Sequence, residues 1–361
     1  MDFDFSEDQY LLRDSIRGFL AAHWGPKPLR AAKGQFSTEL WQGLTGLGLQ
    51  TLLVPEDHGG AGLGLVDAVL AFEAFGRHLV PGPMLETILI SEVIARSGDT
   101  ALLPGIAEGA ARLAFAHAEP GAGHRTEPAG VTATLDRGQW RLHGRKILVP
   151  AADAATGLAV SAQLPDGSAG LFLCELPATG VAIARNIAVD PDSMPCRVDF
   201  AGALATMMRD GALPRLLETS AIAAAAAMIG IAGAALDMAV AYAKQRTQFD
   251  RPIGSFQAIK HRCADMLVAV ETARAAAYYA AWAAAENDAA LPLAVSVAKA
   301  AAGDASRFAC NECLQIHGGV GFTWEFDVHL FLKRAKLLEY SFGDATWHRE
   351  RVAQSVLRVA A

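Results

Sequence analysis

The feature that most constrains the fold is a change of pattern that occurs twice along the chain. Residues 1–112 carry apolar positions at helical spacing. Residues 113–208 instead show short apolar runs separated by glycine, proline and aspartate, which is typical of strands and turns. From 209 to 361 the spacing is helical again. We therefore predict a mainly α-helical chain with three domains at these boundaries, the middle one being a small β-barrel or β-sandwich.

Residues that start or stop helices mark the predicted elements. Ser6 is the predicted N-cap of the first helix, ahead of apolar residues that share one face. Gly318-Gly319 is a C-terminal stop signal, and Gly343-Asp344 precedes the last helix. Long helices joined by short loops imply an antiparallel bundle in the C-terminal domain. Its predicted helices span 215–245, 255–285, 291–316 and 345–359.

The most apolar segment, AIAAAAAMIGIAGAAL at 221–236, consists mainly of alanine and glycine and ends at Asp237. A membrane-spanning helix needs ~20 strongly apolar residues. We interpret the segment as a buried helix whose small side chains let neighbouring helices approach closely. The N-terminal sequence is acidic and amphipathic, unlike a signal or transit peptide. We expect a cytoplasmic protein that does not enter a membrane.

Composition narrows the possible partners and cofactors. Hydrophobic residues make up 52% and charged residues 19%, against roughly 45–50% and 25% in globular proteins, so we expect apolar surface to be hidden in a subunit interface. The net charge of −7 and the lack of long basic runs argue against nucleic-acid binding. The five cysteines show no disulfide framework. Cys310 and Cys313 are interpreted as buried helix residues, and no metal site is predicted.

Several motifs, in order along the chain, resemble those of the acyl-CoA dehydrogenases. QRTQFDRPIGSFQAIKHRCADM (245–266) resembles the signature segment of that family, and QIHGGVGF (315–322) its Q-x-x-G-G-x-G. VPEDHGGAGLGL (54–65) resembles its N-terminal loop, while AEPGAG (118–123) and GRK (144–146) resemble turns of its β domain. The matches cover nearly the whole chain. The resemblance implies an N-terminal helical domain, a central β-barrel, a C-terminal four-helix bundle and FAD as cofactor.

The resemblance also implies a cofactor site. In the family, the arginine that matches Arg246 pairs with the FAD pyrophosphate, and a guanidinium suits this task because its fixed fork meets two oxygens at once. A surface ion pair with Asp250 is the alternative for this residue. Glycines in a loop from the neighbouring subunit let backbone amides approach the diphosphate. The implied cofactor-binding residues are Arg246, Phe249, Gln257, Gln315, Gly318 and Gly319.

The catalytic base of the family is missing at both of its usual positions. Members of the family remove the α-proton of an acyl-CoA with a glutamate while a hydride passes to the flavin. In the aromatic-Glu-Gly-Thr segment of most members, the matching residue here is Phe342. At the alternative position, near the start of a bundle helix, it is Ser220. Neither side chain can accept a proton as a carboxylate does.

The carboxylates near these positions are the candidates for a relocated base. They are Asp344 and Glu218, with Glu339 as a third. The alternative for Asp344 is the N-cap of the last helix. His348 and Glu350, two residues apart on that helix, point to different sides, and we interpret them as solvated or interface residues.

Other departures from the family fall on the side of the flavin ring and the thioester. The usual threonine, tryptophan and serine or threonine are Ala118, Leu148 and Pro150. The residues that match the diphosphate side are retained. Some family members, including ones that act on steroid side chains and dicarboxylic acyl-CoAs, are heterotetramers in which one paralogue keeps the base and the other completes the FAD site. This chain resembles the second kind of subunit.

We therefore expect a subunit of an FAD-linked acyl-CoA dehydrogenase, active in fatty acid or steroid side-chain degradation, that converts an acyl-CoA to an enoyl-CoA. An electron-transfer flavoprotein would be the electron acceptor, as in relatives. Two alternatives stay open. The first is a self-sufficient homomeric enzyme with a relocated acid. The second is a non-enzymatic acyl-CoA- or protein-binding module.

Overall fold

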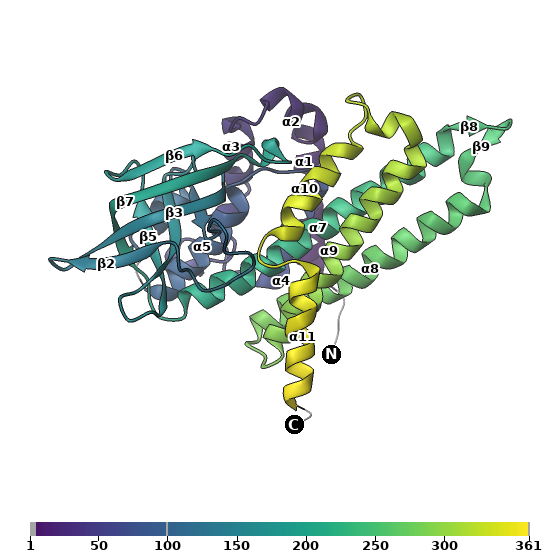
Figure 1. Cartoon of the computed structure of the whole chain (residues 1–361). Helices are drawn as coiled ribbons and strands as arrows, with labels where there is room; N and C mark the ends of the chain where they lie inside the picture. Colours follow the sequence, from purple (N-terminus) through teal and green to yellow (C-terminus); the bar gives the residue numbers. More distant parts are fainter. Residues whose placement is uncertain (1–4, 99, 360–361) are drawn as a thin grey trace. The chain divides into compact units, whose positions relative to one another are not determined.

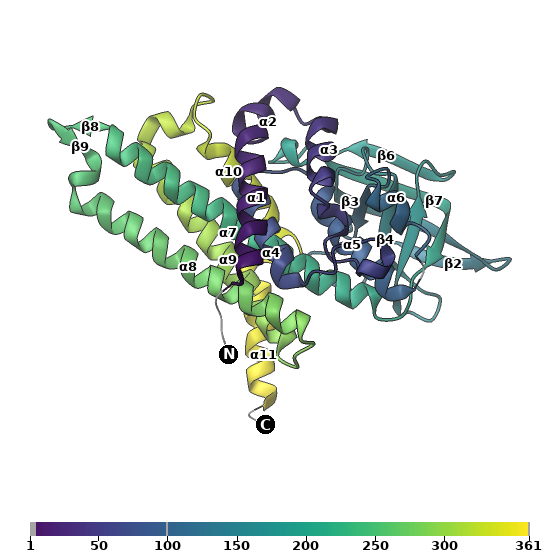
Figure 2. The ribbon, with the colours of Figure 1, turned by 180° about the vertical axis from the view of Figure 1, so that it is seen from behind.

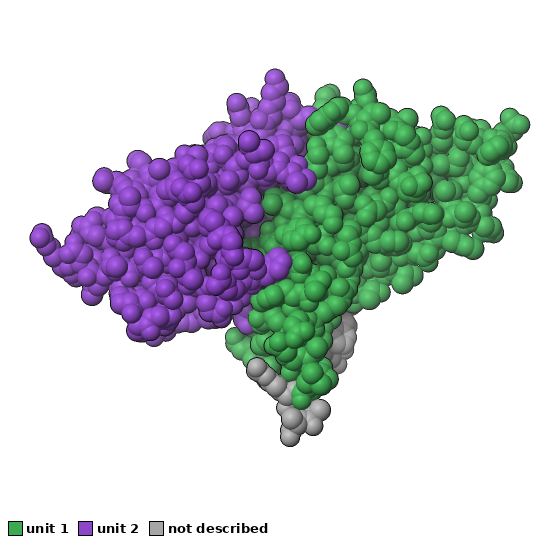
Figure 3. All heavy atoms as spheres, viewed as in Figure 1, with its two compact units in different colours: residues 1–28, 65–80, 221–361 green, residues 29–64, 81–220 purple. Residues whose placement is uncertain are grey.

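The computed structural model describes residues 5–98 and 100–359. The chain divides into two compact units (Figure 3). The first comprises residues 1–28, 65–80 and 221–361, and the second comprises 29–64 and 81–220. The division into domains at 112 and 208 stays a prediction.

The first unit is helical, and its long helices run alternately in opposite directions (Figures 1 and 2). Helix α7 passes from the second unit into the first at residue 221. Two predicted signals at the ends of helices are confirmed: Ser6 caps α1, and α9 stops at Gly318. Helix α2 likewise crosses between the units, at residue 29. The helices that lie wholly or partly in the first unit are α1 (Glu7–His23), α2 (Pro26–Ala32), α4 (Leu65–Arg77), α7 (Ala212–Gln245), α8 (Gln257–Ala285), α9 (Leu291–His317), α10 (Val328–Tyr340) and α11 (Ala345–Val359).

The predicted bundle helices correspond to α7, α8, α9 and α11, and the described part of the segment contains α10 as a fifth. Helix α10 begins after Asp327, whose side chain makes no capping hydrogen bond. Aspartate nevertheless favours the N-cap position, so the sequence carried a start signal that the prediction did not use.

The alanine- and glycine-rich segment of α7 packs directly against α4, as predicted. A Cβ atom placed on Gly230 would lie 1.9 Å from the carbonyl oxygen of Glu73, and one on Gly76 would lie 1.8 Å from that of Ala227. No side chain larger than hydrogen fits at either position. Helix α7 is long and apolar enough to cross a membrane, but 89% of its most apolar window is buried inside the structure. This burial favours the interpretation as a core helix.

The second unit contains a closed β-barrel beside short helices. Strand β4 pairs with β2 and β5, β2 with β3, β3 with β7, and β7 with β5, so the pairing returns to its start. Strands β1 and β6 pair with β4 and β7 respectively. The strands are β1 (Leu113–Ala116), β2 (Thr132–Asp136), β3 (Gln139–Pro150), β4 (Gly157–Gln163), β5 (Ala169–Glu175), β6 (Val181–Arg185) and β7 (Pro195–Met207); the helices are α3 (Thr38–Gly46), α5 (Met84–Ser97) and α6 (Leu103–Ala107).

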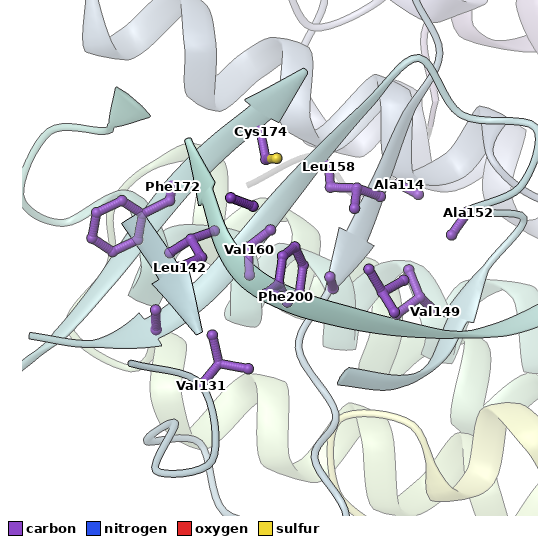
Figure 4. Close-up of a cluster of buried hydrophobic side chains, with 14 of the residues drawn as sticks. Ala114, Val131, Leu142, Val149, Ala152, Leu158, Val160, Phe172, Cys174 and Phe200 are labelled. Carbon is purple, nitrogen blue, oxygen red and sulfur yellow. The ribbon is translucent and has the colours of Figure 1, made fainter. Parts of the chain in front are cut away.

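Buried side chains from the strands fill the barrel. Leu142, Val160, Phe172 and Phe200 lie at its centre (Figure 4). Along β7, the buried residues Cys196, Val198 and Phe200 alternate with less buried ones, as expected for a strand with one face in a core. The predicted fold class, mainly α with a small β domain, is thus confirmed.

Candidate functional site

A short β-hairpin with a two-residue turn follows α7. Its strands are β8 (Thr247–Gln248) and β9 (Arg251–Pro252). Its turn residues Phe249 and Asp250 have φ angles of 52° and 59°. Positive φ at both positions is the pattern of a type I′ turn, which normally takes Asn-Gly. The turn therefore holds a phenylalanine, 85% exposed, in a backbone conformation that costs energy. Strain of this kind marks candidate functional positions.

Arg246 precedes this hairpin and is exposed. Its backbone is fixed, since its N–H donates to the Tyr242 carbonyl oxygen at 2.8 Å and its own carbonyl oxygen accepts from the Ile253 N–H at 2.8 Å. Its side chain forms no ion pair with any residue that the structure describes. The alternative interpretation, in which Arg246 forms an ion pair with Asp250, is therefore wrong. The guanidinium is available to an anion from outside the chain.

The end of α7, the start of α8 and the end of α9 lie together at one end of the helical unit (Figures 1 and 2). The Tyr242 and His317 rings stack with centroids 4.2 Å apart, which ties α7 to α9. An ion pair between Arg262 and Glu312 ties α8 to α9. The predicted cofactor-binding residues are all exposed at this end: Arg246, Phe249, Gln257, Gln315, Gly318 and Gly319.

Gly318 and Gly319 leave open space above the backbone. A Cβ atom placed on either would meet no heavy atom within 4 Å. Gly318 has a φ of 64°, which favours glycine because other residues are strained there. Open backbone and a guanidinium that forms no ion pair with a described residue, both at this end of the unit, fit the requirements of a bound diphosphate. Whether these residues bind a cofactor stays a prediction.

Next to this group, His317 is a buried residue that the sequence did not single out. Burial lowers the pKa of its ring. Its Nδ1 lies 2.7 Å from the Cys313 carbonyl oxygen, which assigns a proton to Nδ1. A neutral ring in this position packs flat on Tyr242 and supports the end of α9.

Two of the base candidates lie close together in the sequence, Glu339 in the last turn of α10 and Asp344 in the loop before α11, and both side chains make contacts within the chain. Asp344 Oδ1 accepts the Trp347 N–H at 2.8 Å, which is the N-cap of α11. Glu339 is 4% exposed, and its carboxylate contacts Arg307 at 3.1 Å and Lys336 at 2.8 Å. The capping interpretation of Asp344 is thus confirmed. Phe342, at the family's base position, has a φ of 58°.

The same loop rests on two buried basic residues. Lys299 on α9 is 1% exposed, and burial lowers its pKa to about 7. His348 on α11 is 2% exposed, and burial together with the nearby Lys299 charge lowers its pKa to about 3. The interpretation of His348 as a solvated or interface residue is therefore wrong for this chain. One signal could have identified Lys299: it interrupts an otherwise uncharged run from Leu291 to Gly303.

Glu218, the other base candidate, lies near the start of α7 in the second unit and is half-buried. Ser220, at the family's alternative base position, is 3% exposed. Arg215, one turn earlier, contacts Glu92 on α5 at 2.7 Å. No observation gives Glu218 a catalytic role, which stays a prediction.

In the barrel, a buried ion pair supports the turn that contains Ala118. Lys146 Nζ donates to Glu119 Oε1 at 2.7 Å, to the His117 carbonyl oxygen at 3.0 Å and to Ser161 Oγ at 2.9 Å. Burial lowers the pKa of Lys146 to about 8, although Glu119 opposes the shift. The Ile147 N–H donates to the Ala118 carbonyl oxygen at 2.9 Å. The backbone of this turn is therefore well fixed.

The residues that follow this ion pair differ from the family's flavin-side pattern. Leu148 is 42% exposed and has a φ of 54°. Its N–H donates to Asn186 Oδ1 at 3.3 Å. A leucine lacks the flat aromatic face of the family's tryptophan, and Pro150 has no hydroxyl. The turn in the barrel is thus firmly supported, but Leu148 and Pro150 lack the aromatic and hydroxyl groups of the family's pattern.

Among the described residues, no three histidine, cysteine or acidic side chains come together in a way that could hold a metal ion. All five cysteines are free thiols. Cys310 and Cys313 are buried in α9, as predicted. Burial raises the pKa of the Cys313 thiol to about 12, so it carries a proton and is a poor nucleophile.

Comparisons with known proteins match this architecture. Family models described as "Acyl-CoA dehydrogenase, N-terminal domain" and "Acyl-CoA dehydrogenase, C-terminal domain" match residues 6–110 and 212–357. The chain is 33% identical to the acyl-CoA dehydrogenase IpdE2 of Mycolicibacterium smegmatis, over 91% of this chain and 93% of the relative. It is also 33% identical to the acyl-CoA dehydrogenase FadE34 of Mycobacterium tuberculosis, over 96% of this chain. The chain spans only 48% of the length of FadE34.

Two solved structures are similar over almost their whole length. A variant of the Tcur3481-Tcur3483 steroid ACAD superposes with a TM-score of 0.92 at 33% identity and covers 98% of this chain and 99% of its own. The ChsE4-ChsE5 complex from Mycobacterium tuberculosis superposes with a TM-score of 0.90 at 27% identity and covers 99% of each chain. Each of these structures is named for two components.

Proposed function

The chain belongs to the acyl-CoA dehydrogenase family, and we propose that it serves as the base-lacking subunit of a heteromeric, FAD-dependent member. Its paralogous partner would carry the glutamate that removes the α-proton of the acyl-CoA. The assembly would form an enoyl-CoA. When bound, FAD supplies the acceptor for the hydride from the β-carbon.

One observation supports this proposal above the others: this chain has the residues that match the family's diphosphate-binding group but lacks the family's catalytic base. Arg246, which forms no ion pair with a described residue, and the open backbone of Gly318 and Gly319 fit a diphosphate. The family's two base positions are instead Phe342 and Ser220, which cannot accept a proton. A subunit that completes a partner's cofactor site needs the first group and not the second.

The roles of this chain's residues follow from their chemistry. The Arg246 guanidinium would pair with diphosphate oxygens, and the exposed Phe249 ring would cover an apolar part of the cofactor. Gln257 and Gln315 have amide groups that can donate to and accept from the cofactor's polar atoms. These residues would bind and orient the cofactor and exclude water, while proton removal would occur on the partner.

The substrate class is argued from similarity. One of the two similar structures is named as a steroid ACAD, and the chain superposes on it over 98% of its length. We therefore propose a CoA thioester with a steroid-derived acyl group as the substrate of the assembly. An electron-transfer flavoprotein is the proposed acceptor of the electrons.

The test is to purify the full chain alone and after co-expression with a paralogue that has glutamate at the position of Phe342. Flavin content from the visible spectrum, native mass and acyl-CoA turnover are measured on both samples. We expect the chain alone to be colourless or under-loaded with FAD, and the co-expressed assembly to be yellow and active.

A yellow homotetramer with one FAD per chain that oxidises acyl-CoA would overturn the proposal in favour of the self-sufficient enzyme. A second contrary result is an assembly without flavin, which would point to the binding module. Neither outcome changes the family assignment.

A further inference from the structure

Two buried side chains hold the loop between α10 and α11 from inside the helical unit. Lys299 Nζ donates to the carbonyl oxygens of Glu339 at 3.0 Å and Gly343 at 2.7 Å. His348 Nε2 lies 2.9 Å from the carbonyl oxygen of Phe342 and donates to it. Three carbonyl oxygens between 339 and 343 are thus fixed by two side chains.

The loop backbone is in a conformation that other contacts must maintain. Phe342 has a φ of 58°, in the left-handed region that costs non-glycine residues energy. Gly343 has a φ of 98°, and a Cβ atom there would lie 2.4 Å from Trp347 Cε3 and 2.8 Å from His348 Nε2. Such strained conformations persist only where several surrounding contacts hold them in place. Here the hydrogen bonds from Lys299 and His348 provide these contacts.

Lys299 acts here as a donor to backbone rather than as an ion-pair partner. The carboxylate of Glu339, the nearest acid on α10, is occupied by Arg307 and Lys336. Burial lowers the pKa of Lys299, and the opposing effects of the Glu339 and Asp344 charges are smaller. A neutral amine retains two N–H groups, which match the two carbonyl acceptors. The contacts therefore survive loss of the proton.

We propose that Lys299 and His348 are positioning residues that set the backbone of residues 339–343, and so fix where residue 342 presents its side chain, whatever that side chain is. The functional meaning rests on the proposed function, in which residue 342 stands at the family's base position. In this chain the loop would present the half-buried Phe342 ring in place of a carboxylate. The loop backbone is thus held in place although position 342 carries no carboxylate.

The proposal is tested by hydrogen–deuterium exchange with mass spectrometry on the full chain. The amides of Ser341, Trp347 and His348 report on the loop, because their N–H groups bond to Leu337, Asp344 Oδ1 and the Asp344 carbonyl oxygen. The variants are Lys299→Met and His348→Leu, which remove the donors, and Phe342→Glu and Phe342→Leu, which change only the presented side chain. Lys336→Met is the matched control, since it removes a lysine that contacts the Glu339 carboxylate instead of a carbonyl.

We expect Lys299→Met and His348→Leu to speed exchange in peptides covering 339–349 at least tenfold, while peptides from α8 stay unchanged. Phe342→Glu, Phe342→Leu and Lys336→Met should stay within about twofold of the parent chain. The proposal is overturned if Phe342→Glu opens the loop as much as Lys299→Met, or if Lys299→Met matches Lys336→Met. Uniform acceleration over the whole unit in both donor variants would also contradict it. The readout needs no flavin, substrate or partner, so its failure is distinguishable from failure of the proposed function.

Discussion

A buried lysine either loses its proton or donates to strong hydrogen-bond acceptors. Lys299 has two acceptors, and its pKa is also lowered. Its two partners are backbone carbonyl oxygens, which are weaker than a carboxylate at holding a positive charge. Burial accordingly places its pKa near 7 in the folded chain, against an ordinary value of 10.5. Glu339 and Asp344 favour the charge on Lys299, and that charge in turn lowers the pKa of the nearby His348.

This shift predicts a pH dependence of stability. Between pH 7 and 10.5 the unfolded chain binds a proton at Lys299 that the folded chain does not, so the contribution of Lys299 to the free energy of unfolding rises with pH and is lost as pH falls. Lys299→Met should therefore cost about 2 kcal/mol more at pH 9 than at pH 6.5. Urea unfolding of both proteins at both pH values measures the difference. Lys146 titrates in an overlapping pH range, but its contribution to the free energy of unfolding is the same in both proteins and cancels in the difference between them. An equal cost at both pH values would contradict the assignment.

A second prediction at this scale separates backbone strain from crowding at Gly343. Gly343→Ala should lower the free energy of unfolding by about 2–4 kcal/mol, because its methyl group would meet the Trp347 and His348 rings in a left-handed backbone. Gly138→Ala is the matched control, since Gly138 has a φ of 80° and open space around it. It should lose only about 1–2 kcal/mol. Urea midpoints measure both, and equal losses would mean that the loop yields to the methyl group.

At the scale of elements, the crossing of α4 and α7 depends on glycine. Gly230→Ala should lower the free energy of unfolding by about 2–4 kcal/mol, because its Cβ would lie 1.9 Å from a backbone oxygen of α4 and the helices would have to separate. Gly233→Ala, three residues along the same helix, is the control. Its nearest neighbours are the side-chain ends of Arg77 and Arg274 at 3.7 and 3.8 Å. It should be neutral or stabilising by up to about 1 kcal/mol, owing to the higher helix propensity of alanine. If both substitutions have the same effect, the close approach does not exist.

Elements could be predicted where the sequence carries a local signal. Ser6 and Gly318 show such signals, and the helices begin and end there. Helix α10 was not predicted, although Asp327, a residue type that favours N-caps, directly precedes it. The type I′ turn at Phe249-Asp250 lacks the usual Asn-Gly, so that turn could not be predicted from local chemistry.

At the scale of the whole molecule, similarity of motifs predicted the family and the barrel between helical segments, because the motifs occur in family order over almost the whole chain. The loop support could not be predicted in this way. Lys299 reaches carbonyl oxygens of residues 339 and 343, about forty positions away, and His348 faces inward rather than toward solvent. Burial of a charged side chain is decided by distant partners that no local pattern reveals. The identity of a base, if this chain has one, is likewise not a local property.

The last prediction concerns Arg246, which would act on the assembly and not on the chain that carries it. Arg246→Ala should leave thermal unfolding of the chain alone unchanged, because the side chain is exposed and forms no ion pair within the described residues. In the co-expressed heteromer it should weaken FAD retention roughly 10- to 100-fold, the equivalent of one lost charge-assisted contact of about 1.5–3 kcal/mol. Arg246→Lys should fall between, since an ammonium keeps the charge without the fork.

Lys244→Ala is the control for this experiment, because Lys244 is an exposed cation in the last turn of the same helix. Flavin released on dilution or gel filtration measures retention in all four proteins. If Arg246→Ala loses no more flavin than Lys244→Ala, the exposed arginine does not contact the diphosphate. If Arg246→Ala destabilises the isolated chain instead, Arg246 supports the fold. The proposal that this chain binds the cofactor while a partner subunit carries the base then loses its main observation. Loss of flavin with an unchanged fold is the result expected if Arg246 binds the cofactor and does not support the fold.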